Sequence, residues 1–396
     1  MKRLTLQSEI FTRGVEDIIT KDELKNLLKS GKPLRVKHGI DATAPDLHIG
    51  HAANLWKIRA LQEAGHKAVI LLGDVTTQIG DPTGRNRTRP VLTKQKIAGN
   101  IVSIEKQIKK ILLTAPARFE LRKSSEWYKK LSVSGFIKIL SLVTHARLIE
   151  RDMFRQRIKR GEEIYEHEMI YPVLQGYDSV MLKSDLTVIG SDQLFNEHMG
   201  RALQEKFGQN PQVIITLKLL PGLDGGGKMS KSSGNYIGLN DSPSDKFGKA
   251  MRLRDSLLIS YLEVYTDVPL SIVREIEKEL RAGKNPMAAK LFFAEALVRC
   301  YHGKELAQKE KEYFLKVFSK KEFTQVPSVS LVHGNYQAVD LLLRLGMVTS
   351  KSEARRLIAQ RAVEINEKKV LQPGEEIRIF KGTVIRVGKR RFVRVR

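Results

Sequence analysis

The stretch KHGIDATAPDLHIGH, residues 37–51, joins a predicted strand over 34–40 to a helix that begins beside two histidines. Asp46 is the expected N-cap of that helix. His48 and His51 are three residues apart, so they share one face of its first turn, next to exposed backbone amides and the positive end of the helix dipole. Anions bind at such a terminus, and we therefore expect a phosphate group here. A metal held by both histidines is the alternative, although no third ligand is signalled nearby.

The residues around this stretch predict a β-α-β unit. After the turn, apolar residues repeat at helical spacing, and Gly65 is placed to end the helix. Residues 68–72 (AVILL) form a continuous apolar run, which is typical of a strand buried on both faces of a parallel sheet. Further strands are predicted over 117–122, 185–189 and 212–217, and helices over 1–33, 94–113 and 163–181. This alternation indicates an α/β fold with a Rossmann-like parallel sheet, whose ligand site lies at the carboxyl ends of the strands.

Polar residues line one face of the predicted helix over 163–181. Tyr171, Gln175 and Asp178 follow one another at spacings of four and three residues, so their side chains share this face. Their neighbours are mostly apolar, which predicts that the three side chains are buried and hydrogen-bonded. They could line a ligand pocket, or they could be satisfied polar groups of the core.

Residues 222–234 (GLDGGGKMSKSSG) form a glycine-rich loop after the last predicted strand of the sheet. Lys228 and Lys231 on such a loop suit a triphosphate, because their charges can neutralise a leaving pyrophosphate. A solvated lysine loop is the alternative. The position after a parallel strand favours the first interpretation, since it puts the lysines at the same sheet edge as residues 37–51.

The chain has 396 residues, a size typical of two or three domains, and a formal net charge of +25. Such a charge favours a polyanionic partner, and a well-solvated, thermostable surface is the alternative. A single cysteine, Cys300, excludes an intrachain disulfide and a cysteine-rich zinc site, and it fits a reducing cytoplasm. We expect neither a signal peptide nor a membrane span, because no apolar run is long enough.

The positive charge peaks toward the C-terminus, where residues 331–396 contain fifteen Lys or Arg and six Asp or Glu. Residues 239–327 are predicted to be helical and 328–335 to be a linker, and two helices and several short strands follow. RNA phosphates are the expected partners of basic side chains in this last part, namely Arg344, Lys351, Arg355, Arg356, Lys389, Arg390 and Arg391. A disordered basic tail is the alternative, but leucines at helical spacing predict a folded core. Residues 147–160 are also basic, which suits either a solvated face or an RNA contact.

Two of these motifs together resemble a known family. Residues 48–51 (HIGH) and 228–232 (KMSKS) look like the two signatures of class I aminoacyl-tRNA synthetases. YPVLQGYDS at 171–179 and GSDQ at 190–193 are similar to the pattern of bacterial tyrosyl-tRNA synthetases. The resemblance extends from about residue 34 to the C-terminus. It implies a Rossmann-like catalytic domain over 1–238, an α-helical anticodon-binding domain over 239–327, and a small α+β RNA-binding domain over 328–396.

The resemblance also implies a role for individual residues. The reacting phosphates would be stabilised by Thr43, His48, His51, Lys228 and Lys231. The nucleotide would also contact Asp41, Gly50, Asp192, Met229, Ser230 and Ser232. Tyrosine would be bound by Lys37, Thr76, Asp81, Tyr171, Gln175, Asp178 and Gln193. Asp178 would accept the hydrogen bond of the phenol, and Lys37 stands where the better-known branch of the family has a tyrosine.

The activity that the resemblance implies is activation of tyrosine by ATP, bound as its Mg²⁺ complex, and transfer to tRNA(Tyr) by a cytoplasmic homodimer without a protein-bound metal. Three alternatives are an RNA-binding protein on a synthetase scaffold that has lost its activity, the tryptophan enzyme of the same subclass, and a nucleotidyltransferase that acts without RNA. The intact motifs argue against the first. Asp178 and Gln175 favour a phenol over an indole, and the basic C-terminus argues against the third.

Overall fold

The computed structural model of the chain describes residues 4–82, 92–230, 233–316, 328–366, 368–388 and 391–396. The chain divides into two compact units, Met1–Gln308 and Lys309–Arg396. The Rossmann-like part and the helices that follow it therefore form one unit up to Gln308, and the three-domain division expected from the sequence remains a proposal. No helix within the described ranges is long and apolar enough to cross a membrane.

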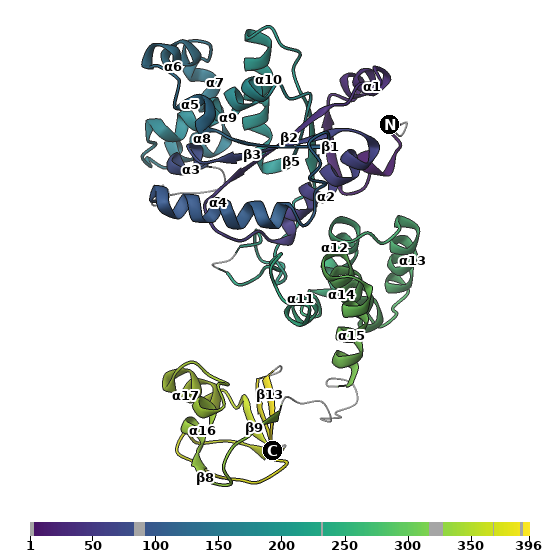
Figure 1. Cartoon of the computed structure of the whole chain (residues 1–396), viewed down its shortest axis with the longest axis vertical. Helices are drawn as coiled ribbons and strands as arrows, with labels where there is room; N and C mark the ends of the chain where they lie inside the picture. Colours follow the sequence, from purple (N-terminus) through teal and green to yellow (C-terminus); the bar gives the residue numbers. More distant parts are fainter. Residues whose placement is uncertain (1–3, 83–91, 231–232, 317–327, 367, 389–390) are drawn as a thin grey trace. The chain divides into compact units, whose positions relative to one another are not determined.

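A six-stranded sheet forms the centre of the first unit. Its strands lie in the order β1 (Val15–Ile19), β6 (Val213–Leu217), β5 (Leu186–Gly190), β2 (Arg35–Asp41), β3 (Lys67–Gly73) and β4 (Phe119–Lys123). Five of them are parallel, as the apolar runs predict. Strands β5 and β6 are buried along their whole length, and helices cover both faces of the sheet (Figure 1).

The prediction of helices over 1–33 is partly wrong. A short 3₁₀ helix (Glu9–Phe11) is followed by β1 and only then by helix α1 (Lys21–Lys29). Strand β1 is antiparallel to β6 at the edge of the sheet, where Ile18 faces Ile215. Its apolar residues are stabilised as a strand by this neighbour, which lies almost 200 residues further along the chain.

The longer helices of the Rossmann-like part alternate with the strands, as the predicted α/β fold requires. Helices α2 (Ile49–Ala64), α4 (Lys94–Ile108) and α10 (Leu194–Lys206) alternate with the strands. Helix α9 (Glu166–Leu182) runs through Pro172 and packs against α10. The shorter helices are α3 (Thr76–Ile79), α5 (Ser125–Tyr128), α6 (Val133–Leu140), α7 (His145–Ile149) and α8 (Asp152–Lys159). Gly65 ends α2 with a φ of 114°, in agreement with its predicted position.

Residues after the sheet are helical, as predicted, up to the start of an undescribed segment at 317. The helices are α11 (Pro243–Ala250), α12 (Leu258–Tyr265), α13 (Leu270–Arg281), α14 (Met287–His302) and α15 (Lys304–Phe314). Helix α12 contacts α2, and α11 contacts α14. Trp56 of α2 donates a hydrogen bond to the hydroxyl of Tyr301 on α14, so these helices are attached to the Rossmann-like part.

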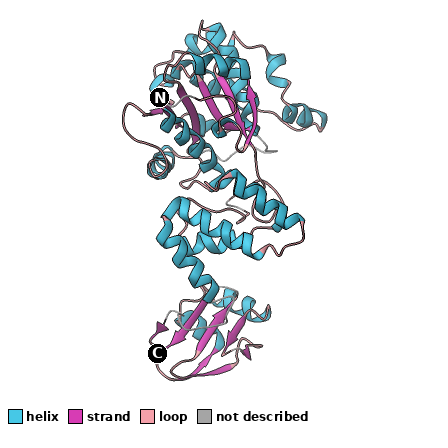
Figure 2. Ribbon diagram, turned by 90° about the vertical axis from the view of Figure 1, so that its right-hand side faces the viewer, coloured by secondary structure: helices cyan, strands magenta, loops and turns pink. Residues whose placement is uncertain are grey.

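The second unit has its own core beneath two helices, α16 (Ala338–Arg344) and α17 (Lys351–Ala359). The core includes Leu341, Leu342 and Ile358, which excludes a disordered basic tail. Figure 2 shows the strands of this unit, which are β7 (Ser328–Val329), β8 (Gly334–Gln337), β9 (Val363–Ile365), β10 (Lys368–Lys369), β11 (Glu376–Ile379), β12 (Val384–Val387) and β13 (Arg391–Val395). The predicted linker at 328–335 is wrong, because β7 pairs with β13 and β8 pairs with β11. These strands are too short to be recognised without their partners.

Candidate active site

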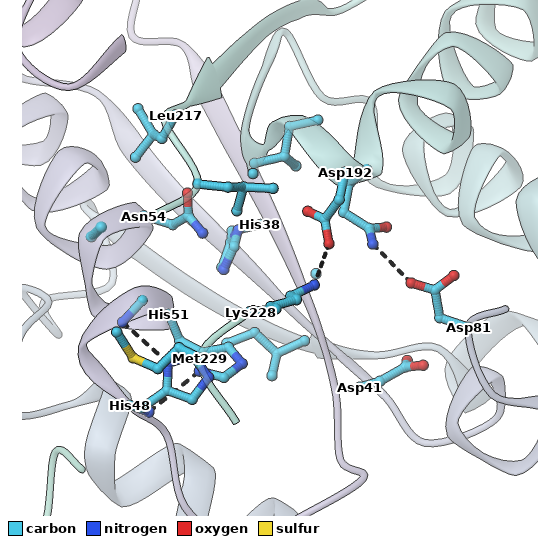
Figure 3. Close-up of a pocket in the computed structure, with 18 of the residues that line it drawn as sticks. His38, Asp41, His48, His51, Asn54, Asp81, Asp192, Leu217, Lys228 and Met229 are labelled. Atoms are coloured by element: carbon cyan, nitrogen blue, oxygen red, sulfur yellow. Dashed lines mark hydrogen bonds and ion pairs between the residues drawn. The ribbon is translucent and has the colours of Figure 1, made fainter. Parts of the chain in front are cut away.

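A cavity of about 550 Å³ opens at the carboxyl ends of β2, β3 and β5. This is the edge at which parallel α/β sheets bind ligands. Figure 3 shows side chains from β2, α2 and residues 228–229 around this cavity, and α9 contributes further lining residues. The predicted site residues that line it are Lys37, Asp41, Thr43, His48, Gly50, His51, Thr76, Asp81, Tyr171, Gln175, Asp178, Asp192, Gln193, Lys228 and Met229. The sequence therefore predicted residues that the fold brings together from five separate segments.

The first turn of α2 presents both histidines, but the predicted N-cap is wrong. His48 itself is the N-cap: its Nδ1 accepts a hydrogen bond of 3.1 Å from the amide of Gly50. The amide of His48 donates in turn to Nδ1 of His51 over 3.3 Å. Asp46, the predicted cap, instead accepts from the side chain of Asn240.

This capping arrangement determines which ring nitrogens can donate. A neutral imidazole carries its hydrogen on the nitrogen that does not accept a hydrogen bond. Since Nδ1 accepts in both rings, the neutral forms of His48 and His51 carry hydrogen on Nε2. The two rings are stacked at a tilt, with centroids 3.9 Å apart, at the wall of the cavity. Together they supply hydrogen-bond donors beside a helix N-terminus, which suits an anionic ligand.

The lysine loop reaches the same cavity. Lys228 forms an ion pair of 2.5 Å with Asp192 (Figure 3), and Met229 is buried beside it. Ser230 is described but does not line the cavity, and its amide donates to Asn235. The remaining predicted residues of this motif, Lys231 and Ser232, lie outside the described residues.

The chain that follows the loop is joined directly to the start of α2. Ile49 donates its amide hydrogen to the carbonyl of Ile237, and Leu239 donates to the carbonyl of Leu47. Lys246 on α11 is fully buried and donates to the carbonyl of Gly238 over 2.6 Å. The start of α2 is therefore joined by backbone hydrogen bonds to the segment that follows the lysine loop, which brings the loop to the same cavity.

Asp178 is buried and hydrogen-bonded, as the sequence predicted. Its side chain is 2% exposed, and Oδ1 accepts a hydrogen bond of 2.9 Å from the indole of Trp127. Burial raises the pKa of Asp178 to about 7, against the opposing effect of the Lys37 ammonium group. A buried carboxylate of this kind can accept a hydrogen bond from a hydroxyl group of a ligand.

Asp41 and Asp81 are each oriented by a predicted site residue. The hydroxyl of Tyr171 donates to Asp41 over 3.0 Å, and Thr76 donates to its other oxygen over 2.7 Å. Burial raises the pKa of Tyr171 well above its usual value, so the phenol stays protonated. Gln193 donates to Asp81 over 2.8 Å. These carboxylates give the cavity a fixed negative wall opposite the histidines.

Lys37 lies at the cavity but is held by a residue that the sequence analysis missed. Its ammonium group contacts both carboxylate oxygens of Glu197, at 2.9 and 3.0 Å, and the two side chains are each 1% exposed. Glu197 lies on α10, four residues after Gln193 and therefore on the same helical face. The four-residue spacing from Gln193 is the sequence signal that could have identified Glu197 as a site residue.

The basic segment 147–160 has a structural role that neither sequence interpretation included. Arg151 is buried, with its guanidinium 4.0 Å from Asp81 and over the ring of Phe195. Arg157 is buried in a two-bond ion pair with Glu168 at 2.8 and 3.1 Å. Two of the basic side chains of this segment therefore stabilise the fold beside the site.

The basic residues predicted to bind RNA belong to the second unit. Lys351, Arg355 and Arg356 are exposed on α17, and Lys351 forms an ion pair with Asp340. Arg344 lies over the ring of Tyr336, and Arg391 forms an ion pair with Glu353. Lys389 and Arg390 lie outside the described residues.

Comparisons with known proteins identify the family of the chain. Residues 29–319 match the family of class I tRNA synthetases for tryptophan and tyrosine. Residues 319–395 match the C-terminal domain of tyrosine–tRNA ligases. Two relatives called tyrosine–tRNA ligase are 42% and 43% identical to this chain, from Carboxydothermus hydrogenoformans and Thermotoga maritima. The first match covers 99% of this chain and 98% of the relative, and the second covers 98% and 97%.

Solved structures show the same fold at lower identity. A truncated mitochondrial tyrosyl-tRNA synthetase of Coccidioides posadasii is 24% identical with a TM-score of 0.62, over 77% of this chain and 90% of that chain. The tyrosyl-tRNA synthetase of Archaeoglobus fulgidus, complexed with L-tyrosine, is 23% identical with a TM-score of 0.60, over 76% and 98%. From these matches, the chain belongs to the class I tryptophan and tyrosine tRNA synthetase family, and within it to the tyrosine–tRNA ligases.

Proposed function

We propose that this chain activates tyrosine with ATP to form tyrosyl-adenylate and then transfers the tyrosyl group to the 3′ end of tRNA(Tyr). One observation carries the proposal. The same cavity is lined by the phosphate-binding start of α2, by Lys228, and by the buried acceptor Asp178. A nucleotide and an amino acid with a phenol can therefore occupy it together.

Tyrosine enters with its phenol toward Asp178. Its ammonium group is bound by acceptors on Tyr171, Gln175 and Asp81, and its carboxylate lies near Gln193, with Thr76 beside the pocket. Phenylalanine would give the buried Asp178 no hydroxyl donor. A site built to bind a hydroxyl group rejects the analogue without it by a factor of about 10⁴–10⁵, and the reference example is this enzyme class itself. Lys37 closes the floor of the pocket.

Activation needs no nucleophile from the protein. The substrate's own carboxylate attacks the α-phosphorus of ATP, a bond forms between them, and the bond to pyrophosphate breaks. Thr43, His48 and His51 donate hydrogen bonds to the phosphate as its charge grows. Lys228 and Lys231 neutralise the departing pyrophosphate. Catalysis is then positioning and electrostatic stabilisation, without an enzyme intermediate.

The nucleotide is held by further contacts. Asp192 accepts from the ribose, and Asp41 also contacts the nucleotide. Gly50 allows close approach to the start of α2, and Met229, Ser230 and Ser232 shape the loop. Mg²⁺ arrives as the ATP complex. Among the described residues, no group of three or more His, Cys, Asp or Glu side chains could hold a metal ion of its own.

The tRNA is bound by the second unit, whose Arg344, Lys351, Arg355, Arg356, Lys389, Arg390 and Arg391 supply positive charge. The terminal ribose of tRNA attacks the carbonyl of the adenylate, and AMP leaves. We place this work in the cytoplasm, because the single cysteine suits a reducing compartment.

We also propose a homodimer, with α6 at its interface. Val133 and Ile137 lie one turn apart on this helix, and their side chains are 77% and 59% exposed. An apolar pair of this kind is stabilised when a second copy covers it. Val133→Lys should shift the chain toward monomers in analytical ultracentrifugation, whereas an unchanged dimer would assign the interface elsewhere.

Amino-acid-dependent ATP–pyrophosphate exchange tests the activity itself. Exchange with tyrosine, and not with phenylalanine or tryptophan, supports the proposal. Exchange with tryptophan would identify the other enzyme of the family. RNA binding with no exchange for any of the three would identify a scaffold that has lost its activity.

A further inference from the structure

A buried polar cluster lies beneath the proposed tyrosine pocket, and its centre is the carboxylate of Glu197. The ammonium group of Lys37 donates to both Glu197 oxygens and to the hydroxyl of Ser179, at 3.0, 2.9 and 2.7 Å. Lys37 comes from β2, Ser179 from α9 and Glu197 from α10. Both charged side chains are 1% exposed, so water cannot replace these contacts.

The protons of Lys37 are fully used by this cluster. An ammonium group has three hydrogens and no lone pair. Ser179 and the two oxygens of Glu197 provide three acceptors within 3.0 Å. A hydrogen bond from Lys37 to the hydroxyl of a ligand would therefore have to replace one of these contacts.

Glu197 also determines the orientation of the Gln175 amide. A carboxylate can only accept hydrogen bonds, so the group that faces it must be the NH₂ end of the amide. Gln175 Nε2 donates to Glu197 over 2.8 Å, and Gln212 Nε2 donates to the other oxygen over 2.6 Å. The carbonyl oxygen of Gln175 is thereby turned away from Glu197.

That carbonyl oxygen is the group needed by an ammonium ligand. It already accepts one hydrogen bond, of 2.9 Å, from Asn196, and a carbonyl oxygen has a second lone pair. Asn196 also donates to the oxygen of Gln193 over 3.0 Å, which leaves the Gln193 NH₂ group toward Asp81. Glu197 therefore fixes the amide orientation of Gln175, and Asn196 links this orientation to that of Gln193. Gln175 and Gln193 line the side of the pocket assigned to the ammonium and carboxylate groups.

We infer that Glu197, held by Lys37, is a positioning residue that turns the oxygen of Gln175 toward the substrate's ammonium group, and that Lys37 does not recognise the phenol. The inference rests on the proposed function, because it assigns the ammonium group to the Gln175 side of the pocket. It gives the Lys37–Glu197 pair a role in binding amino acids as such, separate from the choice between tyrosine and phenylalanine.

The pair is tested best by neutral double variants, because removal of one partner would leave a buried charge without its counter-charge. Lys37→Met/Glu197→Gln keeps a carbonyl oxygen that can accept from Gln175. Lys37→Met/Glu197→Leu has a similar size and keeps no acceptor. The two variants differ in the side-chain amide at position 197, which in the glutamine version can accept from Gln175, so their comparison tests whether an acceptor there orients Gln175.

Two ligands separate ammonium binding from general damage to the pocket. Tyrosinol has the ammonium group, and 3-(4-hydroxyphenyl)propan-1-ol has the same phenol and hydroxyl without it. Relative to the glutamine version, the leucine version should bind tyrosinol about 10-fold more weakly, as expected for one lost charge-assisted hydrogen bond, and bind the deaminated ligand equally well. Both variants should keep the wild-type preference for tyrosine over phenylalanine in pyrophosphate exchange.

Opposite results would overturn the inference. Equal weakening of both ligands would mean that the pair only supports the fold, and a loss of the tyrosine preference would mean that Lys37 recognises the phenol. Glu197→Asp alone provides a second test if the leucine version does not fold. It keeps the ion pair and retracts the carboxylate from Gln175, so it should weaken tyrosinol and spare the deaminated ligand. A wild-type chain without tyrosine-dependent exchange would instead contradict the proposed function.

Discussion

At the scale of the residue, His48 combines two tasks that a substitution can separate. Its Nδ1 caps α2, and in the proposed mechanism its Nε2 donates to the reacting phosphate. His48→Asn keeps a side-chain acceptor for the cap and loses the imidazole donor. We expect the rate of tyrosine-dependent pyrophosphate exchange to fall by about 10²–10³, as for other donors to a transition state, with little change in tyrosine affinity.

The control for this prediction is His48→Ala, which loses both the cap and the donor. It should show the same loss of rate and, in addition, a stability lower by about 1 kcal/mol in thermal or denaturant unfolding. Exchange at the wild-type rate in His48→Asn would remove His48 from the catalytic step.

Asp178 predicts how tyrosine binding depends on pH. Burial raises its pKa from 3.8 to about 7, so the native state binds more protons than the unfolded chain between these values. Its contribution to stability is therefore present below about pH 4 and is lost as the pH rises through about 7. Binding has the opposite trend, because the phenol needs the carboxylate as its acceptor. Tyrosine affinity should weaken below about pH 7, by at most about 10-fold per pH unit.

Equilibrium titration of tyrosine across this pH range, with Asp178→Asn as the matched variant, checks the prediction. The variant should bind tyrosine weakly and without this pH dependence. A wild-type affinity that stays constant down to about pH 5.5 would show that the Asp178 proton is not linked to binding.

Side chains within one element were predictable, whereas their partners were not. Tyr171, Gln175 and Asp178 share a helical face, and helical periodicity alone places them in one pocket. Lys37 was recognised as unusual, but its partner Glu197 is 160 positions further along the chain and belongs to another element. Asp46 was the better capping residue by type, yet the turn brings His48 to that position. Glu197 was missed because its contact with Lys37 is long-range, and the N-cap prediction was wrong because it depends on the geometry of the turn.

At the scale of the element, the ion pair between Arg157 and Glu168 predicts how α8 is attached to α9. Both side chains are at most 5% exposed and share two hydrogen bonds. Arg157→Met leaves Glu168 buried without its counter-charge. We expect destabilisation of about 3–5 kcal/mol, measured by denaturant unfolding monitored through tryptophan fluorescence.

Arg155 on the same helix is the matched control. Its side chain is 60% exposed, and it forms an ion pair with Asp152, whose side chain is 87% exposed. Arg155→Met should change stability by less than about 0.5 kcal/mol. Equal effects of the two substitutions would mean that α8 is not held by the Arg157 ion pair.

The elements that the sequence predicted well are those that carry their own signal. Strand β3 is apolar from Ala68 to Leu72, as expected for a strand whose two faces are both covered by helices, so its composition identifies it. Strand β1 lies at the edge of its sheet, and the strands within 328–337 are two to four residues long. The partners of these strands lie far away in the sequence. Local composition favours coil or helix there, and only the neighbouring strand stabilises the extended form.

At the scale of the whole molecule, we expect adenylate formation and tRNA binding to depend on different units of the fold. The protein has a net charge of +25, and the chain divides into two compact units. The cavity and the residues assigned to adenylate formation belong to Met1–Gln308, whereas the basic helix α17 belongs to Lys309–Arg396. Charge in the second unit should therefore affect tRNA binding without affecting chemistry that involves only small molecules. The composition predicted a polyanionic partner. The position of the basic helix α17 in the second unit predicts that tRNA binding is the step that depends on this charge.

Arg355 and Arg356 provide the test of this division, because both are exposed on α17. Phosphate contacts release counterions, so each one adds to the salt dependence of binding. Arg355→Ala/Arg356→Ala should weaken tRNA(Tyr) binding and reduce the slope of log affinity against log salt concentration by about 1.5–2. Filter binding at several salt concentrations measures the slope, and tyrosine-dependent pyrophosphate exchange should remain at the wild-type rate. An unchanged slope would assign the phosphate contacts to other residues, and a loss of exchange would show that the second unit also acts on adenylate formation.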